Sequence, residues 1–178
     1  NDLSGGEWYY GNVAYAYTND LMNGVGSNLF NPSGTTTRGM VVTILWRLEG
    51  SPVSAEHSFT DVAAGMWYAD AVGWASASGI VEGYGGRFSP EAAVTREQMA
   101  AILYRYAAHK GYDVSGQNGL SAFTDTDSVS DWAGAAVKWA VKNDILSGVG
   151  SNHLDPSGKA QRAQVAAILQ RFIENTDK

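Results

Sequence analysis

The stretch Gly24–Arg38 reads GVGSNLFNPSGTTTR, and it returns at Gly148–Arg162 as GVGSNHLDPSGKAQR with nine of fifteen positions identical. A third copy, GYGGRFSPEAAVTR at Gly83–Arg96, is one residue shorter and lies between the other two. A long motif that returns at intervals indicates a repeat architecture, in which neighbouring copies bury a core that one copy could not close alone. The paired glycines at the start of each copy predict a tight turn.

A tryptophan and an aspartate precede each turn at nearly constant spacing. The tryptophan stands 29 or 30 residues before the arginine that ends the motif. Two of the aspartates end the sequence FTD, at residues 59–61 and 123–125, and the first copy is expected to be clipped at its start. The repeats are expected to span residues 1–50, 51–112 and 113–178 and to form one structural domain together. The recurring residues are Trp8, Trp67 and Trp132, with Asp2, Asp61 and Asp125.

Two helices are predicted in each repeat. After each arginine, apolar residues recur at i, i+3, i+4 and i+7, which is one face of a helix. These positions are Val41, Ile44, Leu45 and Leu48, then Met99, Ile102, Leu103 and Tyr106, then Val165, Ile168, Leu169 and Phe172. Shorter helices are expected over roughly Tyr9 to Asn19, Tyr68 to Ser78 and Ala133 to Asn143, each followed by a residue that tolerates left-handed backbone. No stretch alternates long enough to predict a strand, so the fold is expected to be all-α.

The composition excludes several classes of function. The chain has 178 residues, 44% of them hydrophobic and 17% charged, as is typical of a globular protein. Its net charge of −6 argues against binding to nucleic acid by counterion release, and against a basic face for acidic lipid. It has no cysteine and no eighteen-residue apolar run, so no disulfide, thiolate metal site or membrane insertion is expected. No metal spacing, cofactor motif or recurring catalytic pair is seen, and the chain is not expected to be an enzyme.

The arginine that ends each motif can be interpreted in two ways. Thr95 and Gln98 form a capping box that places Arg96 at the first position of the long helix. A cation there faces the positive end of the helix dipole, at a cost of about 0.3–1 kcal/mol. The arginine could pair with an acid, such as the FTD aspartate. It could instead bind an anion together with the helix N-terminus and the glycine amides, beside a tryptophan face that suits a sugar ring. The residues alone leave both interpretations open.

The order F-x-D, W-Y, short helix, G-x-G, F-x-P and T-R before a long apolar helix resembles the S-layer homology domain over nearly the whole chain. The resemblance implies a pseudo-threefold spindle around a central three-helix bundle, with grooves between repeats. It also implies noncovalent binding to the secondary polysaccharide of a Gram-positive-type cell wall, commonly through a sugar that carries a pyruvate ketal. The expected location is therefore the cell wall or surface layer of a secreting cell, and the partner a pyruvylated, peptidoglycan-linked glycan.

The family's T-R-A-E motif falls on residues 37–40, 95–98 and 161–164, and only the arginine is kept in all three. Gly39 weakens the first helix start and Gln161 replaces the third threonine cap, so Arg96 and Arg38 are expected to matter before Arg162. The aspartates could hold a sugar hydroxyl, but aspartates at turns more often accept backbone N–H bonds. Rival functions are self-association of surface-layer copies and a fragment of a wall hydrolase. The candidate polysaccharide-binding residues are Arg38, Arg96, Arg162, Trp8, Trp67, Trp132, Asp2, Asp61, Asp125, Gly24, Gly83 and Gly148.

Overall fold

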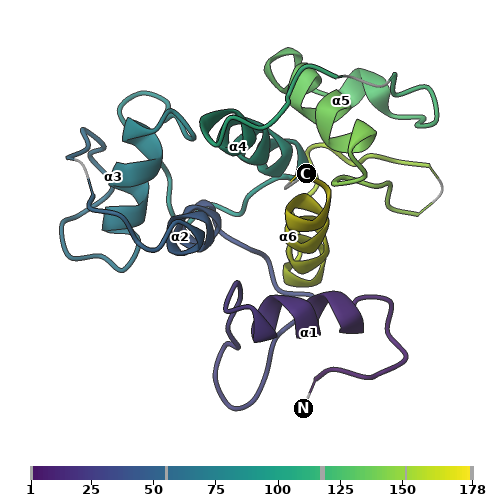
Figure 1. Cartoon of the computed structure of the whole chain (residues 1–178), viewed down its shortest axis with the longest axis horizontal. Helices are drawn as coiled ribbons and strands as arrows, with labels where there is room; N and C mark the ends of the chain where they lie inside the picture. Colours follow the sequence, from purple (N-terminus) through teal and green to yellow (C-terminus); the bar gives the residue numbers. More distant parts are fainter. Residues whose placement is uncertain (1, 55, 117–118, 151, 177–178) are drawn as a thin grey trace.

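The computed structural model describes residues 2–54, 56–116, 119–150 and 152–176, and Figure 1 shows their arrangement. The described residues form six α-helices and two short 3-10 turns, with isolated β-bridges and no named strand. The all-α prediction is therefore confirmed. The elements in chain order are α1 (Tyr10–Thr18), α2 (Arg38–Leu48), α3 (Ala69–Ala77), α4 (Arg96–His109), η1 (Thr126–Ser128), η2 (Asp131–Ala133), α5 (Gly134–Lys142) and α6 (Arg162–Thr176).

The helix boundaries follow the local signals in the sequence. The short helices α1, α3 and α5 lie within one residue of the predicted ranges at each end. The residues predicted to follow them in left-handed backbone, Asp20, Gly79 and Asp144, have φ of 56°, 68° and 54°. The capping box at the start of α4 is present, since Thr95 accepts from the Gln98 amide and the Gln98 side chain accepts from the Thr95 amide. Local chemistry thus sets where the helices begin and end.

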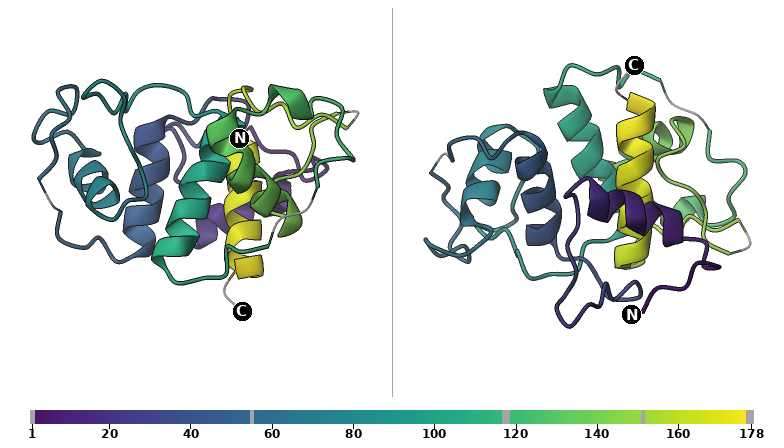
Figure 2. Two further views of the ribbon diagram at one scale, coloured as in Figure 1. Left: turned by 90° about the horizontal axis from the view of Figure 1, so that it is seen from above. Right: turned by 60° about the horizontal axis from the view of Figure 1, so that its bottom comes forward.

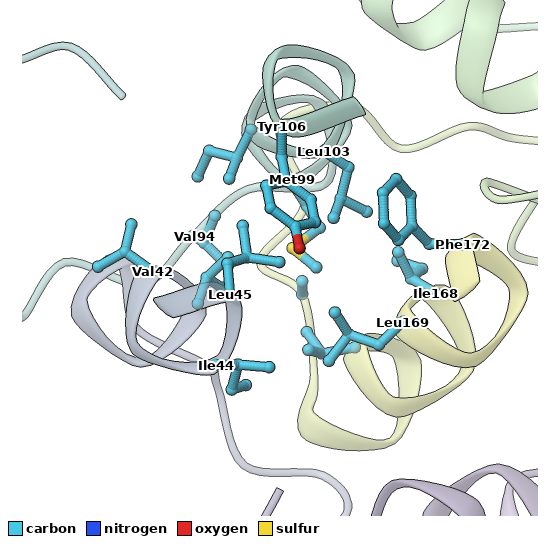
Figure 3. Close-up of a cluster of buried hydrophobic side chains, with 14 of the residues drawn as sticks. Val42, Ile44, Leu45, Val94, Met99, Leu103, Tyr106, Ile168, Leu169 and Phe172 are labelled. Carbon is cyan, nitrogen blue, oxygen red and sulfur yellow. The ribbon is translucent and has the colours of Figure 1, made fainter. Parts of the chain in front are cut away.

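The three long helices α2, α4 and α6 turn their apolar faces toward one another, as Figure 3 shows. The apolar positions predicted from the helical period are buried, including Leu45, Leu103 and Leu169, none of which has measurable exposure. The prediction is wrong for Leu48, which is 37% exposed. Leu48 is the last residue of α2 and lies where the helix leaves the core. The shared core therefore comes from one face of each long helix.

Each short helix packs against the long helix of the preceding repeat. Helix α3 lies on α2 and helix α5 on α4, while α1 lies on α6 at the other end of the chain. Figures 1 and 2 show α1 crossing α6, and the Asn12 Nδ2 group donates to Gln170 Oε1 at 3.0 Å. Each of these pairs therefore joins helices from two different repeats. The pair of α1 and α6 joins the first repeat to the third.

A ring of three peptide hydrogen bonds joins the segments that precede the long helices. The Thr36 amide donates to the Ala160 carbonyl at 3.1 Å, the Ala160 amide to the Val94 carbonyl at 2.9 Å, and the Val94 amide to the Thr36 carbonyl at 2.9 Å. All three residues stand two positions before the arginine of their repeat. The ring thus relates the three repeats in cyclic order, while the spindle shape of the whole and the repeat boundaries stay predictions.

Candidate functional site

The arginines that end the three motifs, Arg38, Arg96 and Arg162, are here called the motif arginines. Each one reaches into the glycine turn of the next repeat and donates to two backbone carbonyls, over distances of 2.5 to 3.1 Å. The Nε–H group binds a carbonyl late in the turn, and Nη2 binds the carbonyl just before the first glycine. The partners are Phe88 and Glu82 for Arg38, Leu154 and Ser147 for Arg96, and Phe30 and Asn23 for Arg162.

These contacts test the interpretation that the motif arginines pair with an acidic side chain. The ion pairs among the described residues involve other cations, namely Arg87, Arg105 and Lys110. No FTD-type aspartate forms an ion pair with a motif arginine in that part of the chain, although the charges of Asp61, Asp125 and Asp2 act to raise the pKa of Arg38, Arg96 and Arg162. Burial lowers the pKa of all three motif arginines, and Arg96 and Arg162 are only 3% and 7% exposed. The guanidiniums of Arg38 and Arg162 also lie 4.6 and 4.5 Å from the rings of Phe88 and Phe30. The motif arginines therefore tie each repeat to the next.

The first amides of the long helices are also used within the protein. The Arg38 amide donates to the Ala92 carbonyl and the Gly39 amide to the Pro90 carbonyl, each within 2.9 Å. The same two bonds recur at the start of α4, to Gly158 and Pro156, and at the start of α6, to Gly34 and Pro32. The hypothesis that these helix N-termini offer backbone amides to an anion is therefore wrong for their first two positions.

The three FTD-type aspartates hold the same turns from the other side. Asp61 accepts the amides of Phe88 and Ser89, both at 2.8 Å. Asp2 and Asp125 accept the equivalent pairs of amides in their own repeats. Burial acts to raise the pKa of Asp61, but these N–H bonds outweigh it and hold the pKa below its ordinary value. The simpler expectation, that the aspartates accept backbone bonds, is confirmed.

The first glycine of each turn is required by close packing. A Cβ on Gly24 would lie 2.8 Å from the Leu29 carbonyl oxygen, and one on Gly148 would lie 3.0 Å from the Phe123 ring. At Gly83 a Cβ would collide with both the Phe59 ring and the Arg87 carbonyl. These glycines therefore allow close packing of the turn, against a phenylalanine ring at Gly83 and Gly148, and they lie where the motif arginines bind.

The three tryptophans are half-exposed. Trp8, Trp67 and Trp132 are 62%, 52% and 56% exposed, so each keeps a large free surface. The rings of Trp8 and Trp67 meet the following tyrosine edge to face, at centroid distances of 5.3 and 5.0 Å. Trp74 and Trp139, by contrast, are buried. The tryptophan of each turn is thus held in place by its neighbours without being covered.

The candidate residues meet in three equivalent grooves, here named by the long helix that forms the floor of each. Each groove takes its motif arginine from one repeat, its glycine turn and long helix from the next, and its tryptophan from the third. The α2 groove contains Arg162, Gly24 and Trp67, the α4 groove contains Arg38, Gly83 and Trp132, and the α6 groove contains Arg96, Gly148 and Trp8. Their volumes are about 220, 510 and 370 Å³, respectively.

A second arginine lines each groove, and the sequence analysis missed it. Arg47, Arg105 and Arg171, here called the outer arginines, stand nine residues after the motif arginine in every repeat. The charge of Arg105 adds to the effect of burial in lowering the pKa of Arg38, so the two guanidiniums lie close enough to interact. The outer arginines could have been predicted from the sequence, because the constant interval of nine residues places each of them on the long helix of its repeat.

Other kinds of site have little support among the described residues. No group of three or more His, Asp or Glu side chains in that part of the chain could hold a metal ion. No helix there has both the length and the apolar character needed to cross a membrane. The Nδ1 atom of His57 is buried, and its ring stacks on the Phe59 ring at a centroid distance of 5.8 Å.

Comparison with known proteins identifies the family. Residues 1–39, 58–100 and 122–166, more than half of the chain, match the family model of the S-layer homology domain. The chain belongs to this family, and the resemblance noted from its motifs is confirmed.

Three relatives show how widely the sequence is shared. The chain is 35% identical over 159 residues to Exoglucanase XynX of Acetivibrio thermocellus and 30% identical over 161 residues to the Surface-layer 125 kDa protein of Lysinibacillus sphaericus. It is 23% identical over 160 residues to the Cellulosome-anchoring protein of Acetivibrio thermocellus. These matches cover 88%, 88% and 86% of the chain but only 14%, 13% and 35% of the relatives. The chain thus corresponds to a small part of each relative.

Proposed function

We propose that this chain is a noncatalytic module that anchors a protein to the bacterial cell surface by binding an acidic wall polysaccharide. The observation that carries the proposal is the set of three grooves, each with two arginines and a half-exposed tryptophan. Relatives named as surface-layer and cellulosome-anchoring proteins support the surface location. We propose the wall of a Gram-positive-type cell as that surface.

The chemistry of the grooves favours a sugar that carries a carboxylate, such as a pyruvate ketal. A guanidinium has five N–H donors, and the two backbone carbonyls of each turn leave donors of the motif arginine unused. Beside it, the outer arginine adds a second cation, and two guanidiniums together suit one carboxylate. The exposed tryptophan face can pack against the apolar face of the sugar ring. Positive charge is thus local to the grooves, which lets a protein of net charge −6 bind an acidic polymer.

Three grooves on one module can act together. A wall polysaccharide presents many chain ends, so binding in one groove raises the effective concentration of ligand at the others. The expected affinity for the polymer is therefore well above that for a single sugar, by roughly 10²-fold or more when the spacing fits.

The experiment that tests the proposal compares wall polysaccharide before and after chemical removal of its pyruvate. The structure favours the outer arginines as probes, because the motif arginines are needed for packing. The variant with Arg47→Ala, Arg105→Ala and Arg171→Ala is expected to bind at least about tenfold more weakly, and loss of the ketal should have a similar effect. Lys138→Ala, which removes an exposed cation on α5 away from the grooves, is the matched control. Equal binding by the parent, the triple variant and the control would contradict the proposal.

The rival function of self-association gives a different result in the same material. In that case the parent would not bind the polysaccharide, and it would sediment as an oligomer whose size depends on protein concentration. Substituting Trp8, Trp67 and Trp132 would then change the sedimentation coefficient and leave glycan binding at zero. A hydrolase fragment would instead shorten the polysaccharide, which size-exclusion chromatography of the glycan would detect.

A further inference from the structure

The three grooves differ at the residue that precedes the first glycine of the turn. This position is Asn23 in the α2 groove, Glu82 in the α4 groove and Ser147 in the α6 groove. Its backbone carbonyl makes the same contact in all three grooves, where it accepts a hydrogen bond from Nη2 of the motif arginine. Only the side chain differs, and in one groove that side chain is a carboxylate.

The side chain at this position contacts the outer arginine in two of the grooves. In the α6 groove the Ser147 hydroxyl accepts from Arg171 Nη1 at 2.9 Å. The outer arginine there has an uncharged partner. In the α4 groove the Glu82 carboxylate lies 3.7 Å from Arg105 Nη2 and forms an ion pair with it. The main-chain carbonyl of Glu82 also accepts from Arg38, so this one residue contacts both arginines of the groove, Arg38 through its main chain and Arg105 through its side chain.

The remaining charges leave the α4 groove different from the α6 groove. Among the described residues that line the α6 groove, Arg96 and Arg171 are the charged side chains and none is acidic. The α4 groove also contains Arg87, but this cation lies 3.6 Å from Asp61 and is already paired. The cation that Glu82 occupies is therefore the one that an incoming carboxylate would need.

We propose that Glu82 is a specificity-determining residue that weakens the α4 groove for anionic sugars. This inference rests on the proposed function. A ligand carboxylate entering the α4 groove must displace Glu82 from Arg105 and then lie near its negative charge. In the α6 groove the ligand displaces only a hydroxyl, because Ser147 is neutral. The α6 groove is therefore the stronger site for a sugar with a pyruvate ketal.

The size of the effect follows from exposure. The Glu82 side chain is 76% exposed, so water and salt screen its interaction with a ligand. A single like charge at contact distance in such surroundings changes affinity by about three- to tenfold. The difference between the grooves should shrink as the salt concentration rises, because salt screens the exposed carboxylate.

The test exchanges the two residues in matched variants, Glu82→Ser and Ser147→Glu, with Glu82→Gln as a variant that keeps the shape and removes the charge. The probes are a methyl hexopyranoside that carries a pyruvate ketal and the same glycoside without it. Trp132 lines the α4 groove and Trp8 the α6 groove, so the NMR signals of their indole N–H groups report the two sites separately. Both exchanged side chains are exposed, and thermal unfolding checks that each variant folds like the parent.

The expected result is a dissociation constant for the ketal sugar about three- to tenfold lower at Trp8 than at Trp132 in the parent. Glu82→Ser and Glu82→Gln should close this gap, and Ser147→Glu should weaken the α6 groove by a similar factor. The sugar without the ketal should not respond to the exchange. Ketal-dependent binding that none of these variants alters would overturn the role of Glu82 and leave the proposed function intact. Absence of ketal-dependent shifts at both tryptophans would overturn the two together.

Discussion

Six arginines occupy two positions on the three long helices, here called two levels: the motif arginines at the start of each helix and the outer arginines nine residues later. The two levels differ in their bonding partners. The motif arginines Arg96 and Arg162 are nearly buried and donate to carbonyls of the next repeat. The outer arginines lie nine residues further along, on the groove side of each helix, where Arg105 contacts Glu82 and Arg171 contacts Ser147. One level therefore holds the repeats together, while the other is free to turn toward a ligand.

The comparison shows that recurrence alone does not separate a structural residue from a binding residue. Both arginines recur in all three repeats, and the family motif contains only the first of them. The bonding partner makes the distinction, since a backbone carbonyl cannot leave its arginine without breaking the turn, whereas a surface hydroxyl or carboxylate can. The grooves then combine both levels, with the motif arginine fixed and the outer arginine adjustable.

The largest expected effect comes from removing a motif arginine. Arg96→Ala should lower the free energy of unfolding by about 3 kcal/mol, because it leaves the carbonyls of Leu154 and Ser147 without their charged donor in a buried place. Urea unfolding followed by tryptophan fluorescence measures this change. Arg171→Ala removes the same side chain at the outer level and should change stability by less than about 0.5 kcal/mol. Equal losses in the two variants would show that the two levels are not different in kind.

A smaller effect is expected when the aspartate behind a motif arginine is replaced. Asp61 holds the amides of Phe88 and Ser89, and the Phe88 carbonyl accepts from Arg38, so the three groups form one chain of bonds. Asp61→Asn should cost roughly 1–2 kcal/mol at neutral pH, since a charged acceptor is replaced by a neutral amide.

The same aspartate predicts how stability depends on pH. The folded-state pKa of Asp61 lies below the ordinary value of 3.8, so the unfolded chain takes up a proton more readily. This contribution is complete above about pH 4 and is lost as the pH falls through the folded-state pKa. Urea unfolding at a series of pH values should give a shallower acid dependence for Asp61→Asn than for the parent. An unchanged slope would mean that Asp61 does not contribute to it.

The smallest expected effect is a gain in stability at the peptide ring. The Thr36 side chain is fully buried, and its hydroxyl has no hydrogen-bond partner among the described residues. Thr36→Val should raise the free energy of unfolding by about 1 kcal/mol, because a valine already fits the equivalent place as Val94. The reverse change, Val94→Thr, should lower it by a similar amount. Thermal unfolding of both variants checks the pair, and a loss on Thr36→Val would point to a bond that the hydroxyl makes.

The sequence was informative where a local signal decides the outcome. The helix caps at Thr95 and the left-handed positions after the short helices, such as Gly79, depend on neighbouring residues and were predicted correctly. The residues Trp8, Arg96 and Gly148 were also singled out one by one, and the structure brings them to one groove. Which copies meet was not predicted, because the three residues come from different repeats and no local pattern says which repeats face one another.

The partners of the motif arginines could not be predicted for a related reason. Backbone carbonyls look the same at every position of a sequence, so nothing marks the carbonyls of Glu82 or Phe88 as the acceptors for Arg38. An acidic side chain is visible in a sequence, and this made the FTD aspartate the more apparent partner, whereas the direct hydrogen bonds of Arg38 go to carbonyls. Only the path of the turn, held by Asp61 and closed on Gly83, shows where these carbonyls point.

The packing of α1 on α6 bears on how the chain is made. The ribosome releases α1 well before α6, and the bonded residues Asn12 and Gln170 are 158 positions apart. At about 5–20 residues per second, α1 waits roughly 8–30 s for its partner, and until then Val13 and Ala16 have no core to enter. Unlike an open array of repeats, which can grow one unit at a time, this closed arrangement cannot be completed before its last helix is synthesised. The pairing of α1 with α6 therefore forms only after α6 has left the ribosome.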